Sequence, residues 1–330
     1  MGREPTCETP ATRVEMRVEF LLIVEMAHDL RFVATVLPKL IGEHFADFRF
    51  HIRQSFFLIL GIQEHGNSQE GRDKEDLIRD LLAAVKNAET FQFRLKDYER
   101  IKGVLEIGDE DVKISLQPLE LYFYVHKPDK GVEILWVEGQ NNGNAWVHPN
   151  SFPYFTLNLN PYGSMMRGGH HVMFDLNFNY LTGIIQTTQS KLGTKFFENV
   201  VDLGKINFNG RLCQQICIEY TGFGLHTYRV RSGENMESIA KANHLSEYLI
   251  LEKNPGLKHY GDIRPNQQIY IPNNYFEKLI LYIDEESSFP LVEMFFDEHG
   301  LFEKYEFYNL KVNVSFAKVD FSKNNPAYHF

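Results

Sequence analysis

The chain has 330 residues, of which 43% are hydrophobic and 24% charged, a composition typical of a soluble globular protein with two domains or one large one. Its net charge of −10 disfavours nonspecific binding to nucleic acids and electrostatic docking on anionic membranes. The three cysteines have neither a CxxC pair nor the Cys/His spacing of a zinc site, so they predict no metal site.

The first 72 residues carry weak patterns, and we assign them no function. Within them, "IRQSFFLILGIQEHGNSQ" at 52–69 has a basic residue, a short apolar run and small polar residues, in the order of a secretory signal. Its position leaves two interpretations open: a signal preceded by an upstream start, or an ordinary buried segment. No apolar run approaches the roughly 20 residues that span a bilayer, so no transmembrane segment is predicted.

Residues 73–90 form the first clear element, an amphipathic helix. Its apolar residues recur at helical spacing, with charged residues on the other side. Such a helix must cover an apolar surface. The residues of the stripe are Leu77, Leu81, Leu82 and Val85.

Strands follow the helix, because segments that alternate or run apolar are separated by Gly, Asn, Asp or Pro. The sequence "EGQNNGNAW" predicts a hairpin turn, since Asn and Gly tolerate positive φ. A helical region is predicted at 174–202, and further strands follow, the last two as a hairpin about "DEHG". The order helix, meander, helices, meander predicts an α+β fold, with an antiparallel sheet covered by helices on one face.

Residues 226–273 differ from their surroundings and predict strand, helix, helix, strand. Tyr228 and Val230 alternate in the first strand, Asn235 and Ser246 are suitable N-caps of the two helices, and a helical stripe follows the first cap. The stretches "YRVRSGENMESIA", "NPGL" and "IRPNQQIYIP" resemble a LysM domain. The resemblance implies a βααβ module that binds N-acetylglucosamine glycans such as peptidoglycan or chitin.

The resemblance also implies where the sugar lies, in a shallow groove between two loops. Backbone groups hold the acetamido groups in such domains, and small apolar contacts rest on the sugar faces. Carried over by position, the contacts are Gly233, Glu234, Asn235 and Met236 in the first loop, and Asn254, Pro255, Gly256 and Leu257 in the second.

Two departures from the usual LysM pattern affect this expectation. The usual "GDT" is "GEN" here, which places Glu234 and Asn235 beside the groove, and the glycine of the usual "PGQ" is Asn266. Asn tolerates the left-handed conformation, so the fold is expected to persist. The longer side chain of Glu234 makes the affinity for glycan less certain than the fold.

The segments 73–222 and 275–330 resemble one domain interrupted by the module. The stretches "YERIKG", "GVEILWVEGQNNGNAWVHP", "LNLNPYGSMMRGGHH" and "YIDEESSFPLVEMFFDEHGLFEKYEFYNLKVNVSFAKVDFSKNNPAYHF" are similar to an envelope family of unknown function that is related in fold to the LolA/LolB lipoprotein carriers. We therefore expect the strands at 213–220 and 278–286 to be antiparallel neighbours, with the module inserted at their turn.

The resemblance implies a sheet bent into a half-open barrel whose concave face holds acyl chains under helices. Alternating apolar residues are expected to line this face, either as a lipid cavity or as a filled core. The candidates are Phe123, Val125, Ile134, Trp136, Met294 and Phe296.

Several polar groups have side chains of the kinds used in catalysis or metal binding. His170 and His171, near Arg167, suggest a metal or a general base, but neighbours on a strand point to opposite faces and would not share one ion. The "YER" at 98–100 is interpreted as a charge pair at the surface or a strand edge. No nucleophile, phosphate-loop or dinucleotide motif occurs. We therefore predict no catalytic residue, no metal and no cofactor.

These observations predict a non-enzymatic bacterial cell-envelope protein, located in the periplasm or envelope. LysM would bind peptidoglycan, and the LolA-like body would hold a lipid or lipoprotein group. Two alternatives remain open: a periplasmic lipid or lipoprotein carrier in which LysM is a protein-contact insert, and a cell-wall-active enzyme that LysM targets. A nucleic-acid partner is not expected.

Overall fold

The computed structural model describes residues 72–330, of which Asp73–Phe330 form one compact unit. The signal-like segment at 52–69 lies outside the described residues, so its two interpretations stay open. The first element, helix α4 (Lys74–Lys86), confirms the predicted amphipathic helix. The Asp73 side chain caps it, and its buried stripe consists of Leu77, Ile78, Leu81 and Val85.

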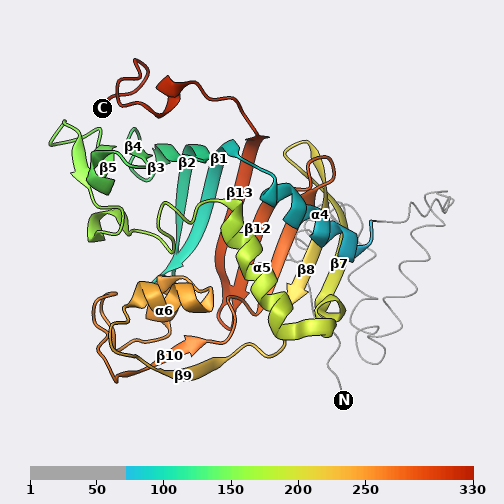
Figure 1. Cartoon of the computed structure of the whole chain (residues 1–330). Helices are drawn as coiled ribbons and strands as arrows, with labels where there is room; N and C mark the ends of the chain where they lie inside the picture. Colours follow the sequence, from blue (N-terminus) through green and yellow to red (C-terminus); the bar gives the residue numbers. More distant parts are fainter. Residues whose placement is uncertain (1–71) are drawn as a thin grey trace, which may run out of the picture. The chain divides into compact units, whose positions relative to one another are not determined.

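One large antiparallel sheet forms the body, as predicted. It has eleven strands in the order β6-β5-β4-β3-β2-β1-β13-β12-β11-β8-β7, and it is not closed (Figure 1). The strands are β1 (Thr90–Ile101), β2 (Val104–Leu116), β3 (Leu119–Lys127), β4 (Glu133–Val137), β5 (Ala145–His148), β6 (Leu157–Leu159), β7 (Val200–Phe208), β8 (Arg211–Glu219), β11 (Lys278–Asp284), β12 (Pro290–Asp297) and β13 (Gly300–Val312).

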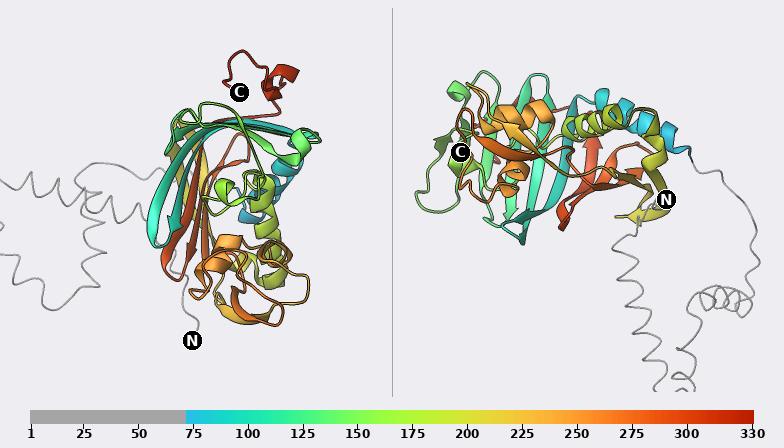
Figure 2. Two further views of the ribbon diagram at one scale, coloured as in Figure 1. Left: turned by 90° about the vertical axis from the view of Figure 1, so that its left-hand side faces the viewer. Right: turned by 90° about the horizontal axis from the view of Figure 1, so that it is seen from below.

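The sheet is curved, and α4 and α5 (Phe178–Leu192) lie on its concave side (Figure 2). The predicted helical region at 174–202 is shorter than expected, because Gly193 adopts a positive φ of 57° and ends α5 there. Short 3-10 turns complete the connections: η3 (Asn141–Gly143), η4 (Ser164–Met166), η5 (Gly193–Lys195), η6 (Phe197–Asn199) and η7 (Lys318–Phe321).

The module is inserted where the sequence predicted. Strands β8 and β11 pair antiparallel, with Glu219 opposite Lys278, and the chain between them forms a separate two-stranded sheet with two helices. The elements of this module are β9 (Leu225–Arg229), α6 (Met236–Asn243), α7 (Glu247–Glu252) and β10 (Gln268–Pro272). A single apolar cluster nevertheless runs from the concave face of the body into the module.

The predicted lining of the concave face is correct on two strands and wrong on a third. Phe123 is buried in the core there, and Ile134 and Trp136 pack against it; Val125 is half-buried on the same side of β3. On β12 the concave face instead carries Glu293 and Phe295. Met294 and Phe296 therefore point to the convex face. The sequence misled here because β12 is buried on both faces, so apolar alternation does not distinguish them.

The last residues of the chain cover part of the convex face. The rings of Tyr328 and Tyr122 stack with centroids 3.9 Å apart, and Lys113 Nζ lies 2.7 Å from Asp320 Oδ1. This closing segment thus belongs to the body. Between residues 72 and 330, none of the helices has the length and apolar character needed to cross a bilayer.

Candidate functional site

The first predicted glycan loop is shaped by its own hydrogen bonds. Gly233 has a φ of +85°, which favours glycine, and Asn235 caps α6 through a reciprocal pair of bonds with Ser238. The Glu234 carboxylate accepts from the Tyr228 hydroxyl at 2.8 Å and from the Arg231 amide at 2.8 Å. Glu234, where the usual LysM pattern has Asp, therefore stabilises the loop. Its longer side chain folds back and bonds to residues of the loop and of β9.

The second predicted loop is fixed by Asn254. This buried side chain donates to the carbonyls of Ile250 and Tyr270, both at 2.7 Å, and accepts from the Tyr270 amide at 2.8 Å. Asn254 thus ties the end of α7 to β10. Pro255 and Gly256, which follow it, are exposed to solvent.

Asn266 has a φ of +69°, so the predicted left-handed conformation is confirmed, and its amide donates to the Val230 carbonyl at 2.8 Å. A depression of about 680 Å³ lies beside the second loop, lined by Gly256, Leu257, Lys258, Asp262, Arg264, Pro265, Asn266 and Gln267.

Only two of the eight predicted contacts, Gly256 and Leu257, line this depression. Met236 and Asn254 are buried, so their side chains serve the fold of the module. Sequence reasoning missed the charged residues from 258 to 264, which motif matching does not mark as functional. The positive φ expected at Asn266 was the available indication that the closing turn contributes to this surface.

Helix α7 of the module is docked on the body through buried charges. Arg100 on β1 donates to Asp297 at 3.0 and 2.5 Å and to Glu252 of α7 at 3.2 and 3.0 Å. Lys253 Nζ also contacts Asp297, at 2.7 Å, and Glu298 at 2.9 Å. The prediction of a charge pair at the surface or at a strand edge is therefore wrong for Arg100, because β1 lies between β2 and β13. The Arg100 side chain is only 11% exposed, because the module covers it.

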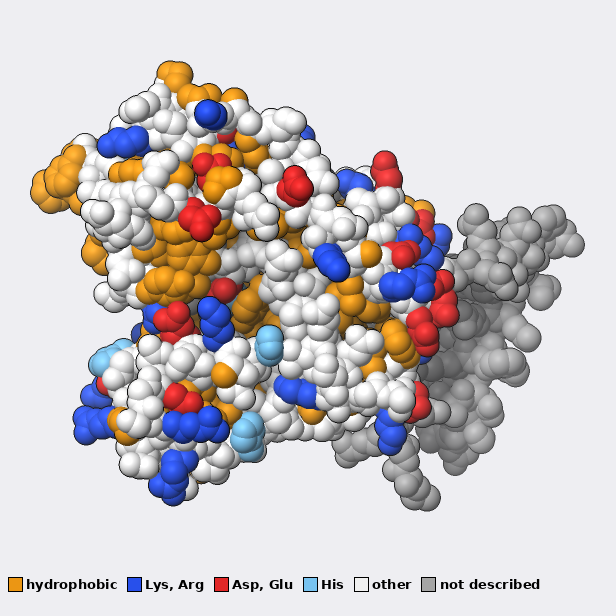
Figure 3. Space-filling model, in the orientation of Figure 1, with side chains coloured by type: hydrophobic (Ala, Val, Ile, Leu, Met, Phe, Trp, Pro, Cys, Tyr) orange, Lys and Arg blue, Asp and Glu red, His pale blue; other side chains and the backbone are white. Residues whose placement is uncertain are grey.

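Two further contacts fix the module from the loop that precedes α5. Arg167 pairs with Glu247 at 2.9 Å, and the ring of Tyr248 stacks on His170 with centroids 4.5 Å apart. The Tyr248 hydroxyl also accepts from the Lys102 amide at 2.7 Å. On the face shown in Figure 3, charged side chains mark the boundary between the body and the module below it. These contacts join α7 of the module to the body.

A cluster of histidine and glutamate lies beneath this docked helix. Glu99 on β1 and Glu303 on β13 are direct cross-strand neighbours, an arrangement that is unfavourable for like charges unless it is compensated. His170 Nδ1 lies 2.7 Å and His171 Nε2 3.2 Å from the same oxygen, Glu303 Oε2. The strand geometry assumed for the two histidines is therefore wrong: they lie in an irregular segment, and both rings reach one carboxylate.

Tyrosines complete the cluster. Tyr275 donates to Glu303 Oε1 at 2.7 Å and Tyr305 to Glu99 Oε1 at 2.6 Å, while the His170 amide donates to Glu99 Oε2 at 2.8 Å. Glu99 is thus also buried, contrary to the surface pair expected from "YER".

Burial and charge act in opposite directions on the ionisable groups here. Burial alone would lower the pKa of His171, but the Glu303 charge raises it to about 9. Burial alone would raise the pKa of Glu303, but His171 and His170 hold it well below its usual range. Burial, together with the Glu303 charge, raises the pKa of Glu293 to about 8. A histidine cation beside the Glu303 anion is therefore favoured at neutral pH.

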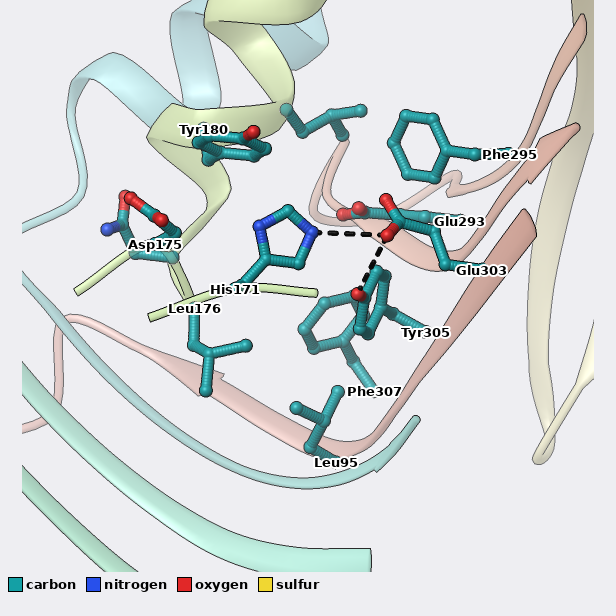
Figure 4. A pocket seen from close by; sticks show the side chains of 12 residues that line it. Leu95, His171, Asp175, Leu176, Tyr180, Glu293, Phe295, Glu303, Tyr305 and Phe307 are labelled. Atoms are coloured by element: carbon teal, nitrogen blue, oxygen red, sulfur yellow. Dashed lines mark hydrogen bonds and ion pairs between the residues drawn. The ribbon is translucent and has the colours of Figure 1, made fainter. Parts of the chain in front are cut away.

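A cavity of about 30 Å³ adjoins the cluster on the concave face (Figure 4). His171 Nδ1 and the Tyr180 hydroxyl are buried without a protein partner, and both belong to residues that line it. This volume has room for one or two water molecules. Its other lining residues include Leu95, Asp175, Glu293, Phe295 and Phe307.

The sequence of the body matches a family of proteins. The model of DUF1571, described as a protein of unknown function, matches residues 88–226 and 263–330, more than half of the chain. The chain belongs to the DUF1571 family. A LysM domain model matches residues 228–272, which confirms the resemblance of the module. No curated protein sequence matches the chain significantly.

The chain is also similar to several solved structures. A chain of the Pseudomonas aeruginosa MucA/MucB complex is 12% identical, with a TM-score of 0.35 over 76% of this chain and 61% of that one. The lipoprotein LppX of Mycobacterium tuberculosis is 14% identical, with a TM-score of 0.35 over 74% and 99%. A domain from Vibrio parahaemolyticus described as an outer membrane lipoprotein-sorting protein is 11% identical, with a TM-score of 0.30 over 76% and 96%.

No function follows from the similarity at these identities and TM-scores. The chain spans less than two thirds of the length of the MucB structures it matches. Within this DUF1571 body, three stretches that suggested the family from the sequence meet at the cluster: "YERIKG" supplies Glu99, "SMMRGGHH" supplies both histidines, and "LFEKYEF" supplies Glu303.

Proposed function

We propose that the protein is a non-enzymatic component of the bacterial cell envelope or periplasm. Its LysM domain binds peptidoglycan or a related N-acetylglucosamine glycan, and the DUF1571 body holds that domain in a fixed orientation. The observation that carries the proposal is the LysM match at 228–272, together with two loops whose backbone at Gly233 and Gly256 is open to solvent.

Shape and chemistry of the second loop support this binding mode. The shallow depression of about 680 Å³ carries amide and charged groups as well as exposed backbone, and such groups form hydrogen bonds with acetamido and hydroxyl groups. Asn254 and Asn235 prepare the two loops in advance, which lowers the entropy cost of binding.

The concave face of the body fits a support for the LysM domain better than it fits a lipid carrier. Ligand pockets for small molecules have volumes of about 300–1,000 Å³. The cavity on this face measures about 30 Å³, and Phe174 closes against Trp136 with ring centroids 4.8 Å apart. An acyl chain could bind on this face only if the packed side chains, such as Phe174 and Trp136, moved apart. The cavity of about 30 Å³ is therefore too small to hold an acyl chain.

Retention of the full chain on insoluble peptidoglycan tests the proposal. In the Gly256→Gln variant, the added side chain would occupy the depression, and an added Cβ meets no atom within 4 Å, so the fold is expected to persist. The matched control is Gly224→Gln, which is equally open but does not line the depression. We expect Gly256→Gln to reduce retention at least tenfold and Gly224→Gln to leave it unchanged.

Absence of retention by the unmodified chain would refute the proposal. Equal retention by both variants would show that the depression does not bind the glycan. Release of soluble muropeptides by the purified chain would instead favour a cell-wall enzyme targeted by LysM.

A further inference from the structure

We propose that His170, His171, Glu303 and Glu99 form a binding site for one divalent transition-metal ion of the zinc type. The site lies in the body beneath α7 and is independent of the glycan-binding loops. Imidazole nitrogens and carboxylate oxygens are the ligands that such ions take in proteins.

The ligand atoms are already gathered. One atom each from Glu99, His170 and Glu303 lie within 4.8 Å of one another, and all three residues are buried. His171 Nε2 lies 3.2 Å from Glu303 Oε2. Two ligand atoms on one tetrahedral zinc are roughly 3.3 Å apart, given bond lengths of about 2 Å. The spacing of His171 and Glu303 already fits, whereas His170 Nδ1 and Glu303 Oε2, 2.7 Å apart, would have to separate.

The orientation of His170 supports an ion at this place. Its Nε2 lies 3.1 Å from the Arg100 carbonyl, which can only accept, so Nε2 carries a proton. Its Nδ1 faces Glu303 Oε2 at 2.7 Å. Nδ1, the ring nitrogen on the Glu303 side, is therefore the one that can take up an ion shared with this carboxylate. A backbone carbonyl on the second ring nitrogen is the usual support of a metal-binding histidine.

The surrounding chain is built to hold these groups together. A Cβ on Gly169 would lie 2.4 Å from Glu99 Oε2, so a side chain there would displace the Glu99 carboxylate from its place beside His170. Tyr275 and Tyr305 orient the two carboxylates. His171 Nδ1 faces the small cavity, where a water molecule can accept its proton when Nε2 binds the ion.

The alternative to a metal is a second proton on His170, which would make the cluster a plain ion-pair network. Titration calorimetry with zinc chloride on the chelator-treated full chain, together with metal analysis by mass spectrometry, separates the two. We expect one zinc ion per chain. We also expect at least a tenfold loss of affinity in Glu303→Gln and in His170→Gln.

Two control variants are matched in chemistry. Glu293→Gln removes a buried carboxyl next to Glu303, and His126→Gln removes a histidine on β3 outside the cluster. Both are expected to bind zinc like the unmodified chain. Cobalt substitution of the unmodified chain gives a readout that needs no variant: a tetrahedral His/carboxylate site shows intense visible absorption.

The proposal is overturned if the unmodified chain binds no zinc, or if Glu303→Gln and His170→Gln bind it as tightly as the controls. Should these two variants fail to fold, the cobalt spectrum decides, and its absence overturns the proposal. Peptidoglycan retention is measured on the same chelated protein, so failure of the metal site does not affect the test of glycan binding.

Discussion

Asn254 shows how a residue placed correctly by its motif can have a different role from the one expected. The sequence assigned it to the glycan contacts, but its amide joins the end of α7 to β10. Periodicity and spacing identify a loop, yet they do not show which of its side chains turn inward.

Replacing Asn254 tests this role. Asn254→Ala leaves the Tyr270 amide and the Ile250 carbonyl without their partner, and each buried group left unsatisfied costs about 1–3 kcal/mol. We expect a loss of at least about 1 kcal/mol in the free energy of unfolding by urea. A variant as stable as the unmodified chain would contradict the assigned role.

The ionisation of Asp297 makes the stability of the docked module depend on pH. Burial alone would raise its pKa, but hydrogen bonds from Arg100 and Lys253 hold it below the ordinary value. Because the folded pKa is the lower one, its stabilisation is present above the unfolded pKa of about 4 and is lost as the pH falls through the folded pKa.

Asp297→Asn is therefore expected to cost about 3–5 kcal/mol at pH 7, since it leaves two cations without their shared carboxylate. The difference from the unmodified chain should begin to shrink below about pH 4, where Asp297 is protonated in the unfolded chain, and should disappear only below its lower folded pKa. Urea unfolding at several pH values measures both effects. The control Glu285→Gln, in a half-exposed pair with Lys205, is expected to cost less than about 1 kcal/mol. A pH-independent difference would argue against the ion pair.

Among the elements, α4, the hairpin about "DEHG" and the caps at Asn235 and Ser246 follow from the sequence, because periodicity, turn residues and capping are local. The sequence does not show which side chains of β12 point to the concave face, because β12 is buried on both sides. Its register is set by its neighbours β11 and β13, which lie outside any local window.

Substitutions of Phe295 and Phe296 test which side chain of β12 points to the concave face. Phe295 is 2% exposed in the concave core, so Phe295→Ala is expected to cost about 3–5 kcal/mol. Phe296 is half-buried under Lys278, whose Nζ lies 4.6 Å from the ring centroid, so Phe296→Ala is expected to cost about 1 kcal/mol. Unfolding by urea compares the two variants. A larger loss for Phe296→Ala would restore the original prediction.

For the molecule as a whole, the resemblance correctly indicated a curved sheet with an inserted module. It did not reveal how the module is held. The contacts that dock α7 join residues far apart in the chain, such as Arg100 to Glu252 and Asp297, so spacing gives no indication of them. The same holds for the histidine–glutamate cluster, whose members come from three separate stretches.

Hydrogen–deuterium exchange of the full chain, with and without an N-acetylglucosamine oligosaccharide, tests the central claim most directly. If the module binds glycan while fixed on the body, exchange slows in the loops at 231–236 and 254–267, and the strands of the concave face do not change. Unchanged exchange in both loops, or slowing on β3 and β4 instead, would contradict the account.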